Sequence, residues 1–211
     1  MDLFDLRNEY TSRTFDESDA LRSPFELFEK WFHEAQESKI FEPNAMALAT
    51  VNAHGIPSVR MILLKSFNAD GFMFFSNYES RKGYQLIDNP NAASVFYWEE
   101  LERQVRIEGI VEKLSSKESD KYFETRPTGS RLGAWASPQS RVVESRQWLE
   151  KKHNEFREKF KHSEVPRPAN WGGYRLKPTL VEFWQGRAHR LHDRLQYRRS
   201  GKKWILERLA P

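Results

Sequence analysis

Cysteine is absent from the 211 residues of this chain, and its absence excludes several kinds of chemistry. The protein can form no disulfide, no thiolate nucleophile and no cysteine-ligated metal centre. No apolar run approaches the roughly 20 residues that a membrane-spanning helix needs. The first ten residues also lack the cationic and then apolar pattern of a secretory signal peptide. We therefore expect a protein of the cytoplasm.

Three common classes of catalytic site are also missing from the sequence. There is no glycine-rich phosphate loop or dinucleotide fingerprint, which argues against a Walker or Rossmann nucleotide site. There is no nucleophile elbow, so a serine hydrolase is not expected. His189 and His192 would face opposite sides of a strand, and no carboxylate cluster joins them. We therefore expect no metal site.

Aromatic and charged residues, by contrast, are plentiful. Aromatic side chains make up 14% of the chain, which is enough for a substantial core, and charged ones make up 30%. The formal net charge is +4, from 34 basic and 30 acidic residues. Such a small positive balance permits anionic partners without requiring nucleic acid.

The order of the sequence patterns predicts a single domain after an N-terminal arm. Residues 1–22 are polar and aperiodic, so we expect a flexible arm there, and we assign residues 23–211 to one domain. Ser23-Pro24-Phe25-Glu26 is typical of a helix start with a capping box. Apolar residues at helical spacing continue this helix to about Ser38.

Short strands dominate the rest of the chain. Turns such as His54-Gly55 and Asp70-Gly71 separate them, which favours antiparallel pairing. So many strands in succession predict a mainly β fold with α insertions (α+β), arranged as a closed or nearly closed barrel. The expected strands are 44–51, 58–65, 72–76, 93–98, 103–113, 171–176 and a C-terminal hairpin. The expected helices are 81–87, 115–125 and 146–161, and Ser115 and Glu118 suit a second capping box at the start of helix 115–125.

The segment from His189 to Arg194 concentrates cations near the C-terminus. If it is a strand, Arg190, His192 and Arg194 lie on one face, because side chains alternate along a strand. Three such groups repel one another unless solvent or an anion lies between them. Two interpretations stand: a solvated face of an edge strand, or the floor of a site for an anionic ligand.

Another basic pair lies in the expected strand 58–65. Arg60 and Lys65 are five positions apart, so they would face opposite sides of a regular strand. Either a bulge re-aims one of them, or the two serve different parts of a ligand assembly.

Two further clusters could bind phosphate. The segment 76–82 joins a strand end to a helix start and carries two adjacent cations, and the free N–H groups of a helix start suit an anion. Tyr122 and Arg126 are one helical turn apart, and Ser130 follows just beyond them. Spacing alone favours the plainer interpretation of each cluster, a surface loop and a helix end.

These clusters belong to a longer series of separate motifs. In chain order the motifs are Arg60-Met61-Ile62-Leu63-Leu64-Lys65, Ser80-Arg81-Lys82, Leu101-Glu102-Arg103-Gln104-Val105, Tyr122-Phe123, Arg126-Pro127, Gly133-Ala134-Trp135, Gln139-Ser140, Trp171-Gly172-Gly173, Glu182-Phe183-Trp184-Gln185-Gly186, His189 to Arg194 and Glu207-Arg208-Leu209-Ala210-Pro211. Together they resemble the pyridoxine (pyridoxamine) 5′-phosphate oxidase family. The resemblance covers residues 20–211 in order and is looser over 1–19.

The resemblance implies an FMN-binding split-barrel fold and a homodimer with FMN in a cleft between the subunits. It implies an oxidase that converts pyridoxamine or pyridoxine 5′-phosphate to pyridoxal 5′-phosphate, with O2 as acceptor and H2O2 as product. The FMN contacts carried over by motif are Arg60, Met61, Ile62, Leu63, Leu64, Lys65, Phe75, Ser76, Arg81, Lys82, Gln104, Gln139, Ser140, Trp184 and Arg194.

The resemblance also implies which residues meet the substrate. Two of these are implied to be catalytic: Arg190, always protonated, holds the substrate over the flavin, and His192 is the more credible proton acceptor. Two others, Arg7 and Tyr10, belong to an arm that closes over the site. The full set of implied substrate contacts is Lys65, Tyr122, Arg126, Ser130, Arg190, His192, Arg7 and Tyr10.

Two other functions stay open. A split-barrel flavin reductase-like enzyme with an unphosphorylated substrate would not need the clamp of Tyr122, Arg126 and Ser130. A non-enzymatic module that binds pyridoxal phosphate or nucleic acid would use the basic C-terminal hairpin, and its nucleic-acid affinity would fall steeply with salt. We expect neither nucleic acid nor a membrane as a partner.

Overall fold

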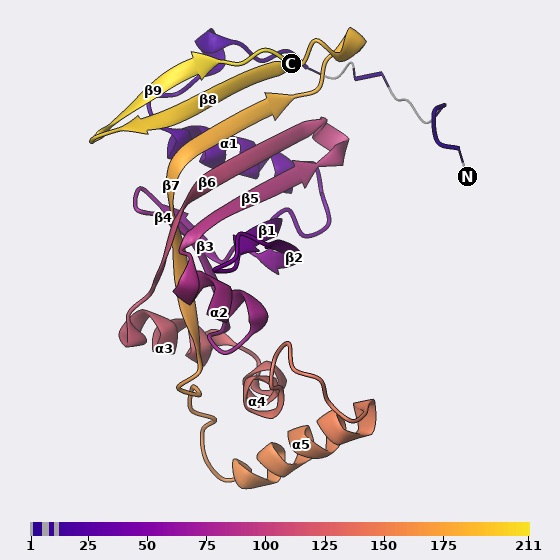
Figure 1. Ribbon diagram of the computed structural model, residues 1–211, viewed down its shortest axis with the longest axis vertical. Coiled ribbons are helices and arrows are strands. Elements are labelled where there is room, and N and C mark those ends of the chain that lie inside the picture. Colours follow the sequence, from indigo (N-terminus) through magenta and orange to yellow (C-terminus); the bar gives the residue numbers. More distant parts are fainter. Residues whose placement is uncertain (1, 6–8, 11–12) are drawn as a thin grey trace.

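The computed structural model describes residues 2–5, 9–10 and 13–211. Within them, nine strands form one sheet and five α-helices lie around it (Figure 1). The strands are β1 (Ala45–Val51), β2 (Pro57–Leu63), β3 (Ser66–Asn68), β4 (Gly71–Asn77), β5 (Asn91–Trp98), β6 (Arg103–Lys113), β7 (Trp171–Gln185), β8 (Asp193–Ser200) and β9 (Lys203–Arg208). The helices are α1 (Pro24–Glu37), α2 (Arg81–Asp88), α3 (Ser116–Thr125), α4 (Thr128–Ala136) and α5 (Arg146–Lys159), with short 3-10 turns at Glu17–Asp19, Glu99–Leu101 and Ala188–Arg190.

The sheet is antiparallel and open. Its strands follow the order β2-β1-β5-β6-β7-β4-β3, and β8 and β9 continue beside the second half of β7. The prediction of a mainly β fold with α insertions is confirmed. Among the described strands no pairing joins β2 to β3 at the two ends of this order, so the sheet does not close into a complete barrel.

Strand β7 is the longest strand and forms the spine of the sheet. It pairs with β6 along most of its length, with β4 over Trp171–Leu176 and with β8 over Leu180–Gln185. The register with β6 shifts between Glu108 and Gly109, opposite Pro178, which has no N–H to donate to a ladder. A Cβ on Gly109 would lie 2.1 Å from the Lys177 carbonyl oxygen, so this close approach requires glycine.

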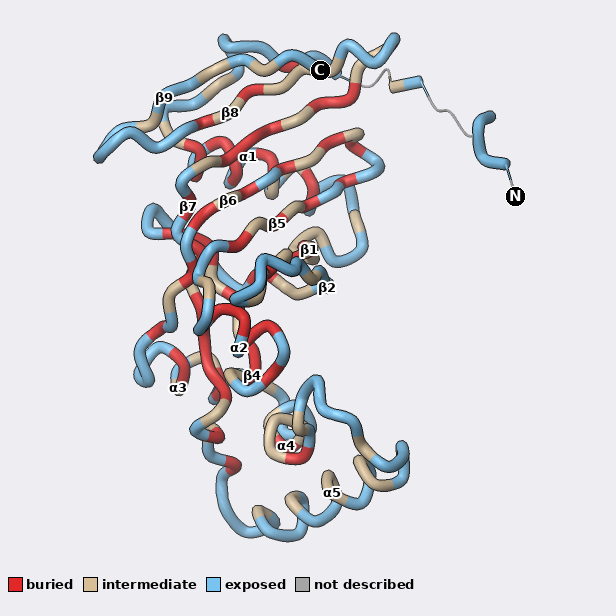
Figure 2. The backbone as a smooth tube through the Cα atoms, viewed as in Figure 1, coloured by how far each residue is buried: buried red, intermediate tan, exposed pale blue. Residues whose placement is uncertain are grey.

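The core lies between α1 and the sheet, as the aromatic face of that helix predicted. Ser23 caps the helix by accepting a hydrogen bond from the Phe25 amide, and Pro24 occupies the first turn. Phe28 is fully buried, with the rings of Phe67 and Phe72 centred 4.9 and 5.0 Å away. Figure 2 shows the same buried interior continuing along β6 and β7.

The helices α4 and α5 form a separate pair at one end of the molecule (Figure 1). Trp135 of α4 packs against Phe156 and Phe160, and α5 has no fully buried residue. The sequence did not predict α4, because Gly129 and Gly133 lower its helix propensity. The predicted capping box at the start of α3 is present.

Part of the predicted arm packs against this core. Phe15 is buried, its ring centre lies 5.0 Å from that of Trp31, and Glu17–Asp19 forms a 3-10 turn. Arg7 lies outside the described residues, and the division at residue 22 stays a prediction. No helix of the described chain is long and apolar enough to cross a membrane.

The core makes a direct stability prediction. Phe28→Ala removes a ring that packs against five other aromatic rings, so we expect the free energy of unfolding to fall by about 3–5 kcal/mol in a urea titration. The control Phe41→Ala removes a ring that is 89% exposed and should change it by less than about 0.5 kcal/mol. Equal losses in the two variants would contradict this placement of the core.

Candidate active site

A cavity of about 620 Å³ lies where β2, β4, α2 and α3 meet. Most of the segments around it belong to the predicted phosphate clusters or to the basic pair in strand 58–65. Its lining residues are Arg60, Met61, Ile62, Leu63, Lys65, Phe75, Ser76, Lys82, Tyr122, Thr125, Arg126, Pro127, Ser130, Gln139 and Trp171. Most of the residues predicted to contact a flavin or a phosphorylated substrate therefore share one cavity.

One part of the cavity is basic and lacks compensating acid. Lys82 donates to Gln139 Oε1 at 2.8 Å, and the Ser76 hydroxyl donates to the same oxygen at 3.0 Å. Arg60 turns towards β1, where Nη1 donates to the Leu48 carbonyl at 3.0 Å. Among the described residues, neither cation forms an ion pair with a carboxylate. Phosphate is a group whose charge would balance this arrangement.

Burial and mutual repulsion perturb these two cations. Burial, and then the charge of Arg60, lower the pKa of Lys82 to about 8. Burial and the nearby charge of Arg81 lower the pKa of Arg60. Arg81 starts α2 and is exposed, so it acts on the cavity through its charge and does not line it.

The second phosphate cluster, formed by Tyr122, Arg126 and Ser130, packs into an aromatic stack through its tyrosine ring. Tyr122 stacks on Phe75 with ring centroids 3.9 Å apart, and Phe75 stacks on Trp171 at 5.7 Å. The Arg126 guanidinium lies 4.5 Å from the centre of the Trp171 ring. Its Nη1 is buried without a hydrogen-bond partner, and burial lowers its pKa. A buried donor with no partner is costly, and an anionic ligand would satisfy it.

The end of β2 explains how Arg60 and Lys65 reach the same cavity. The strand stops at Leu63, and Leu64 is buried in the core away from the cavity lining. The backbone N–H of Lys65 then donates to the Met73 carbonyl of β4 at 2.9 Å. The regular alternation of side chains along β2 therefore ends before Lys65. For this reason Arg60 and Lys65 can line the same cavity although they are five positions apart.

A second group of predicted residues lies on β6, β7 and β8. Gln104, Trp184 and Arg194 are direct neighbours in register across these three strands. The His192 ring centre lies 4.6 Å from that of Trp184, and the Tyr10 ring packs edge-on against both at 5.6 Å. Arg194 is held by Glu182, which accepts from its Nε at 2.7 Å.

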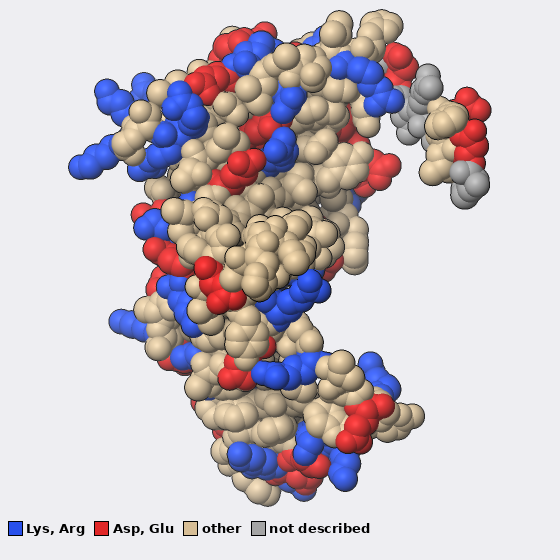
Figure 3. All heavy atoms as spheres, in the orientation of Figure 1, with Lys and Arg blue, Asp and Glu red and all other residues tan. Residues whose placement is uncertain are grey.

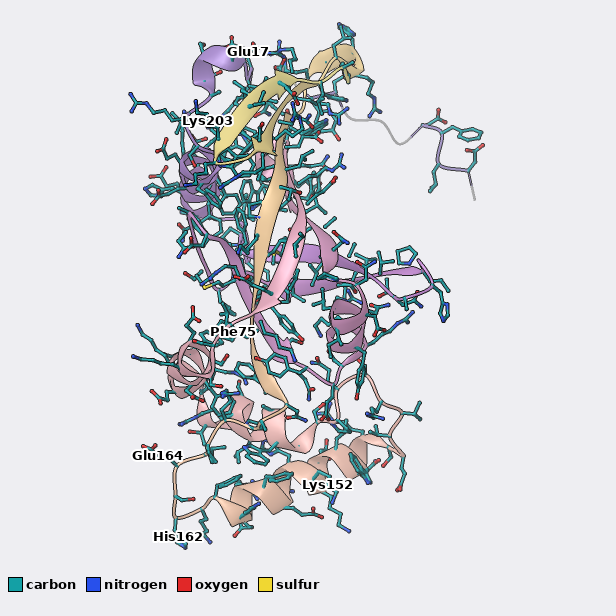
Figure 4. All side chains as sticks on the ribbon, turned by 60° about the vertical axis from the view of Figure 1, so that its left-hand side comes forward. Glu17, Phe75, Lys152, His162, Glu164 and Lys203 are labelled. Atoms are coloured by element: carbon teal, nitrogen blue, oxygen red, sulfur yellow. The ribbon has the colours of Figure 1, made fainter. Side chains whose placement is uncertain are left out.

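The two groups lie far apart in one protomer. Trp171 lines the cavity and Trp184 belongs to the second group, and the two are thirteen positions apart along β7. At about 3.3 Å per residue this separation is roughly 40 Å along the strand. Figure 4 shows Phe75 near the middle of the molecule and Glu17 and Lys203 at the end that carries β8 and β9. The structure therefore does not bring together all the predicted site residues within one chain.

The expectation of a strand through residues 189–194 is wrong in its first part. Strand β8 begins at Asp193, and the preceding residues form a 3-10 turn in which His189 and Arg190 have φ of 56° and 62°. Alternation therefore does not place Arg190 and His192 on the face of Arg194. The predicted hairpin beyond it is confirmed by β8 and β9, and basic side chains project at its tip (Figure 3).

Sequence reasoning missed three lining residues, and three predicted FMN contacts from neighbouring segments, Leu64, Arg81 and Ser140, do not line the cavity. Thr125, Pro127 and Trp171 line the cavity, and Trp171 could have been found because it opens a Trp-Gly-Gly motif. Ser140 is exposed with φ of 71° and does not line the cavity, although its neighbour Gln139 does.

Comparison with known proteins places these features in a family. Residues 32–160 match the family model described as pyridoxamine 5′-phosphate oxidase, and residues 171–211 match the pyridoxine 5′-phosphate oxidase C-terminal dimerisation region. The chain belongs to the pyridoxamine 5′-phosphate oxidase family. The resemblance that the motifs carried is thereby confirmed.

Relatives of similar length support the assignment over the whole chain. A pyridoxine/pyridoxamine 5′-phosphate oxidase of Cupriavidus metallidurans is 55% identical over 99% of both chains, and one of Nostoc punctiforme is 56% identical over 98% of this chain and 97% of its own. The crystal structure of PhzG from Burkholderia lata, in complex with tetrahydrophenazine-1-carboxylic acid, is 34% identical with a TM-score of 0.89 over 94% of this chain and 98% of its own.

A more distant structure shows the shared fold. An FMN-binding protein of Nostoc punctiforme, related to pyridoxamine 5′-phosphate oxidase, has a TM-score of 0.71 at 20% identity, over 91% of this chain and 100% of its own. The expected split-barrel architecture is confirmed.

Proposed function

We propose that this protein is an FMN-dependent oxidase that converts pyridoxamine 5′-phosphate or pyridoxine 5′-phosphate to pyridoxal 5′-phosphate, reduces O2 and releases H2O2. The observation that carries the proposal is the cavity, where two groups of cations without carboxylate partners face a common space. Two phosphorylated ligands account for two such groups. The full-length relatives named as this oxidase support the same reaction.

The residues of the cavity fit FMN. Arg60, Lys82, Ser76 and Gln139 supply the donors and the positive charge that the FMN phosphate needs, and no carboxylate in the described part of the chain pairs with either cation. Each charge-assisted hydrogen bond contributes about 1.5–3 kcal/mol. Bound FMN would accept a hydride from the C4′ carbon of the substrate and pass the electrons to O2.

The second cation group fits the phosphate of the substrate. Arg126 offers its unpartnered Nη1, and the hydroxyls of Tyr122 and Ser130 and the ammonium of Lys65 line the same cavity. The stack of Phe75 on Tyr122 holds the tyrosine ring in place and limits water on that side. These residues bind and orient the substrate, so that its reacting carbon meets the cofactor in a fixed geometry.

The protein forms a homodimer through its C-terminal dimerisation region, and we place FMN at the interface of this dimer. Gln104, Trp184, Arg190, His192 and Arg194 of one protomer would complete the cavity of the other. The separation of Trp171 and Trp184 by roughly 40 Å along β7 supports this arrangement, because a second protomer can bring its own Trp184 group to the cavity. Tyr10 would belong to the same contributed face.

The structure gives reasons to prefer this function over the alternatives. PhzG was solved with a phenazine carboxylic acid, and a ligand without phosphate would leave the buried Nη1 of Arg126 to a weaker partner. For the nucleic-acid module, several arginines of the basic hairpin are already paired, Arg198 with Glu207 and Arg208 with Glu17. A location in the cytoplasm stays a prediction.

The function is tested by the colour of the purified protein. We expect a yellow flavoprotein whose absorbance near the visible flavin maximum is lost anaerobically on addition of pyridoxamine 5′-phosphate and returns in air. Pyridoxal 5′-phosphate and H2O2 should appear in equal amounts. A colourless protein that takes up no added FMN would contradict the proposal.

Arg126→Ala tests the substrate clamp. Loss of a charge-assisted hydrogen bond of about 1.5–3 kcal/mol should raise KM for pyridoxamine 5′-phosphate by about tenfold to 150-fold. Unphosphorylated pyridoxamine should be affected far less, because it lacks the group that Arg126 binds. Lys121→Ala, on the exposed side of α3, is the matched control. Equal effects on both substrates would assign Arg126 another role.

Lys82 makes the affinity for FMN depend on pH. Its pKa of about 8 means that the ammonium is present below pH 8 and is lost as the pH rises through that value. We expect FMN to bind the apoprotein several-fold more weakly at pH 9 than at pH 7, measured by quenching of flavin fluorescence. Lys82→Arg should bind equally at both values, because a guanidinium stays protonated. A wild-type affinity that does not change over this range would contradict the role of Lys82.

A further inference from the structure

The segment between β7 and β8 carries His192 and is held in an unusual conformation. It runs from Gly186 to His192, and the consecutive residues His189 and Arg190 both adopt left-handed backbone angles. Non-glycine residues adopt such angles only where surrounding contacts impose them. The contacts that hold this segment therefore bear on the position of the histidine.

One carboxylate supplies several of those contacts. Asp193 Oδ2 accepts from Arg187 Nη1 at 2.9 Å and from the Phe15 backbone N–H at 3.1 Å. Its Oδ1 accepts from Arg208 Nη1 at 3.2 Å, and Arg208 also donates to Glu17. The side chain of Asp193 is 18% exposed. It thus ties the two ends of the segment to each other, to β9 and to the N-terminal part of the chain.

The same segment fixes the chemistry of the imidazole. The backbone N–H of Arg187 donates to His192 Nδ1 at 3.2 Å. Because a ring nitrogen that accepts a hydrogen bond carries no proton, the neutral ring must carry its proton on Nε2. Trp184 and Tyr10 pack against the ring, and a Cβ on Gly186 would meet Tyr10 at 2.7 Å. No described residue hydrogen-bonds Nε2.

We propose that Asp193 and Arg187 are positioning residues that keep Nδ1 of His192 bonded to the chain, so that the ring meets the substrate as an Nε2–H hydrogen-bond donor and not as a proton acceptor. The proposal rests on the oxidase function and deepens it. Arg187 acts twice, because its side chain pairs with Asp193 while its backbone N–H holds the ring. An Nε2–H binds a lone pair on the substrate and orients it, whereas the sequence had suggested that His192 takes a proton.

The proposal is tested in the FMN-loaded protein by 15N NMR of labelled histidine. The chain has six histidines, and the His192 signals are those missing from His192→Gln. Above its titration, His192 of the wild type should show a protonated Nε2 and an unprotonated Nδ1. Asp193→Asn keeps one carbonyl oxygen but removes the charge, and Arg187→Gln leaves Asp193 bound to Phe15 and Arg208. In both variants we expect signals averaged between the two tautomers.

Kinetics separates positioning from a structural role. In Asp193→Asn and Arg187→Gln, kcat should fall about tenfold or more while KM and the FMN content stay near the wild type, because misplacement of a group near the chemistry affects the reacting geometry. The matched control Glu207→Gln removes a carboxylate from the neighbouring strand, paired with Arg198, and should change neither kcat nor the tautomer.

Two results would overturn the proposal: a wild-type His192 protonated on Nδ1, or an Asp193→Asn variant with the wild-type tautomer and kcat. If the wild type oxidises no B6 phosphate but the two variants show the expected change of tautomer, the proposed function is wrong and the positioning role is supported. The NMR comparison needs no turnover, so the two failures are distinguishable.

Discussion

A single strand, β7, carries one member of each group of predicted site residues and keeps these two members apart. Trp171 at one end lies in the cavity, and Trp184 near the other end lies between Gln104 and Arg194. An extended backbone cannot shorten, so the length of β7 fixes the path along the strand between Trp171 and Trp184. We propose the shared site of the homodimer partly for this reason, since a second protomer can supply at the cavity the side chains beside Trp184, which lies roughly 40 Å along β7 from Trp171.

Charge explains why the cavity needs ligands. Most arginines elsewhere on the sheet are neutralised, as Arg103 is by Glu34 and Arg194 by Glu182. Arg60, Lys82 and Arg126 are partly buried without a carboxylate, and burial lowers the pKa of each. Buried charge without a partner is costly in the free protein. In the function that we propose, binding of phosphorylated ligands offsets that cost, which makes the same residues the source of affinity.

Local patterns in the sequence predicted single helices and strands better than they predicted the irregular turn before β8 or the function of the site. The helix start at Ser23, the capping box of Ser115 and the shared face of Tyr122 and Arg126 all follow from spacing within one segment. The turn at His189 and Arg190 could not be predicted in this way, because local preference disfavours left-handed backbone angles at residues other than glycine. The identity of the site came from the series of motifs, since spacing alone favoured ordinary surface and helix-end roles.

The most direct test of the shared site is complementation between two impaired variants, measured at a substrate concentration below the wild-type KM. Arg126→Ala removes a cavity residue and His192→Ala removes a residue of the other group, so each homodimer has two defective sites. In mixed dimers, one site receives both substitutions and the other receives none. Random exchange makes half of the dimers mixed, and we expect activity to recover to about a quarter of wild type. Activity that stays at the sum of the two variants would contradict a site built from both protomers.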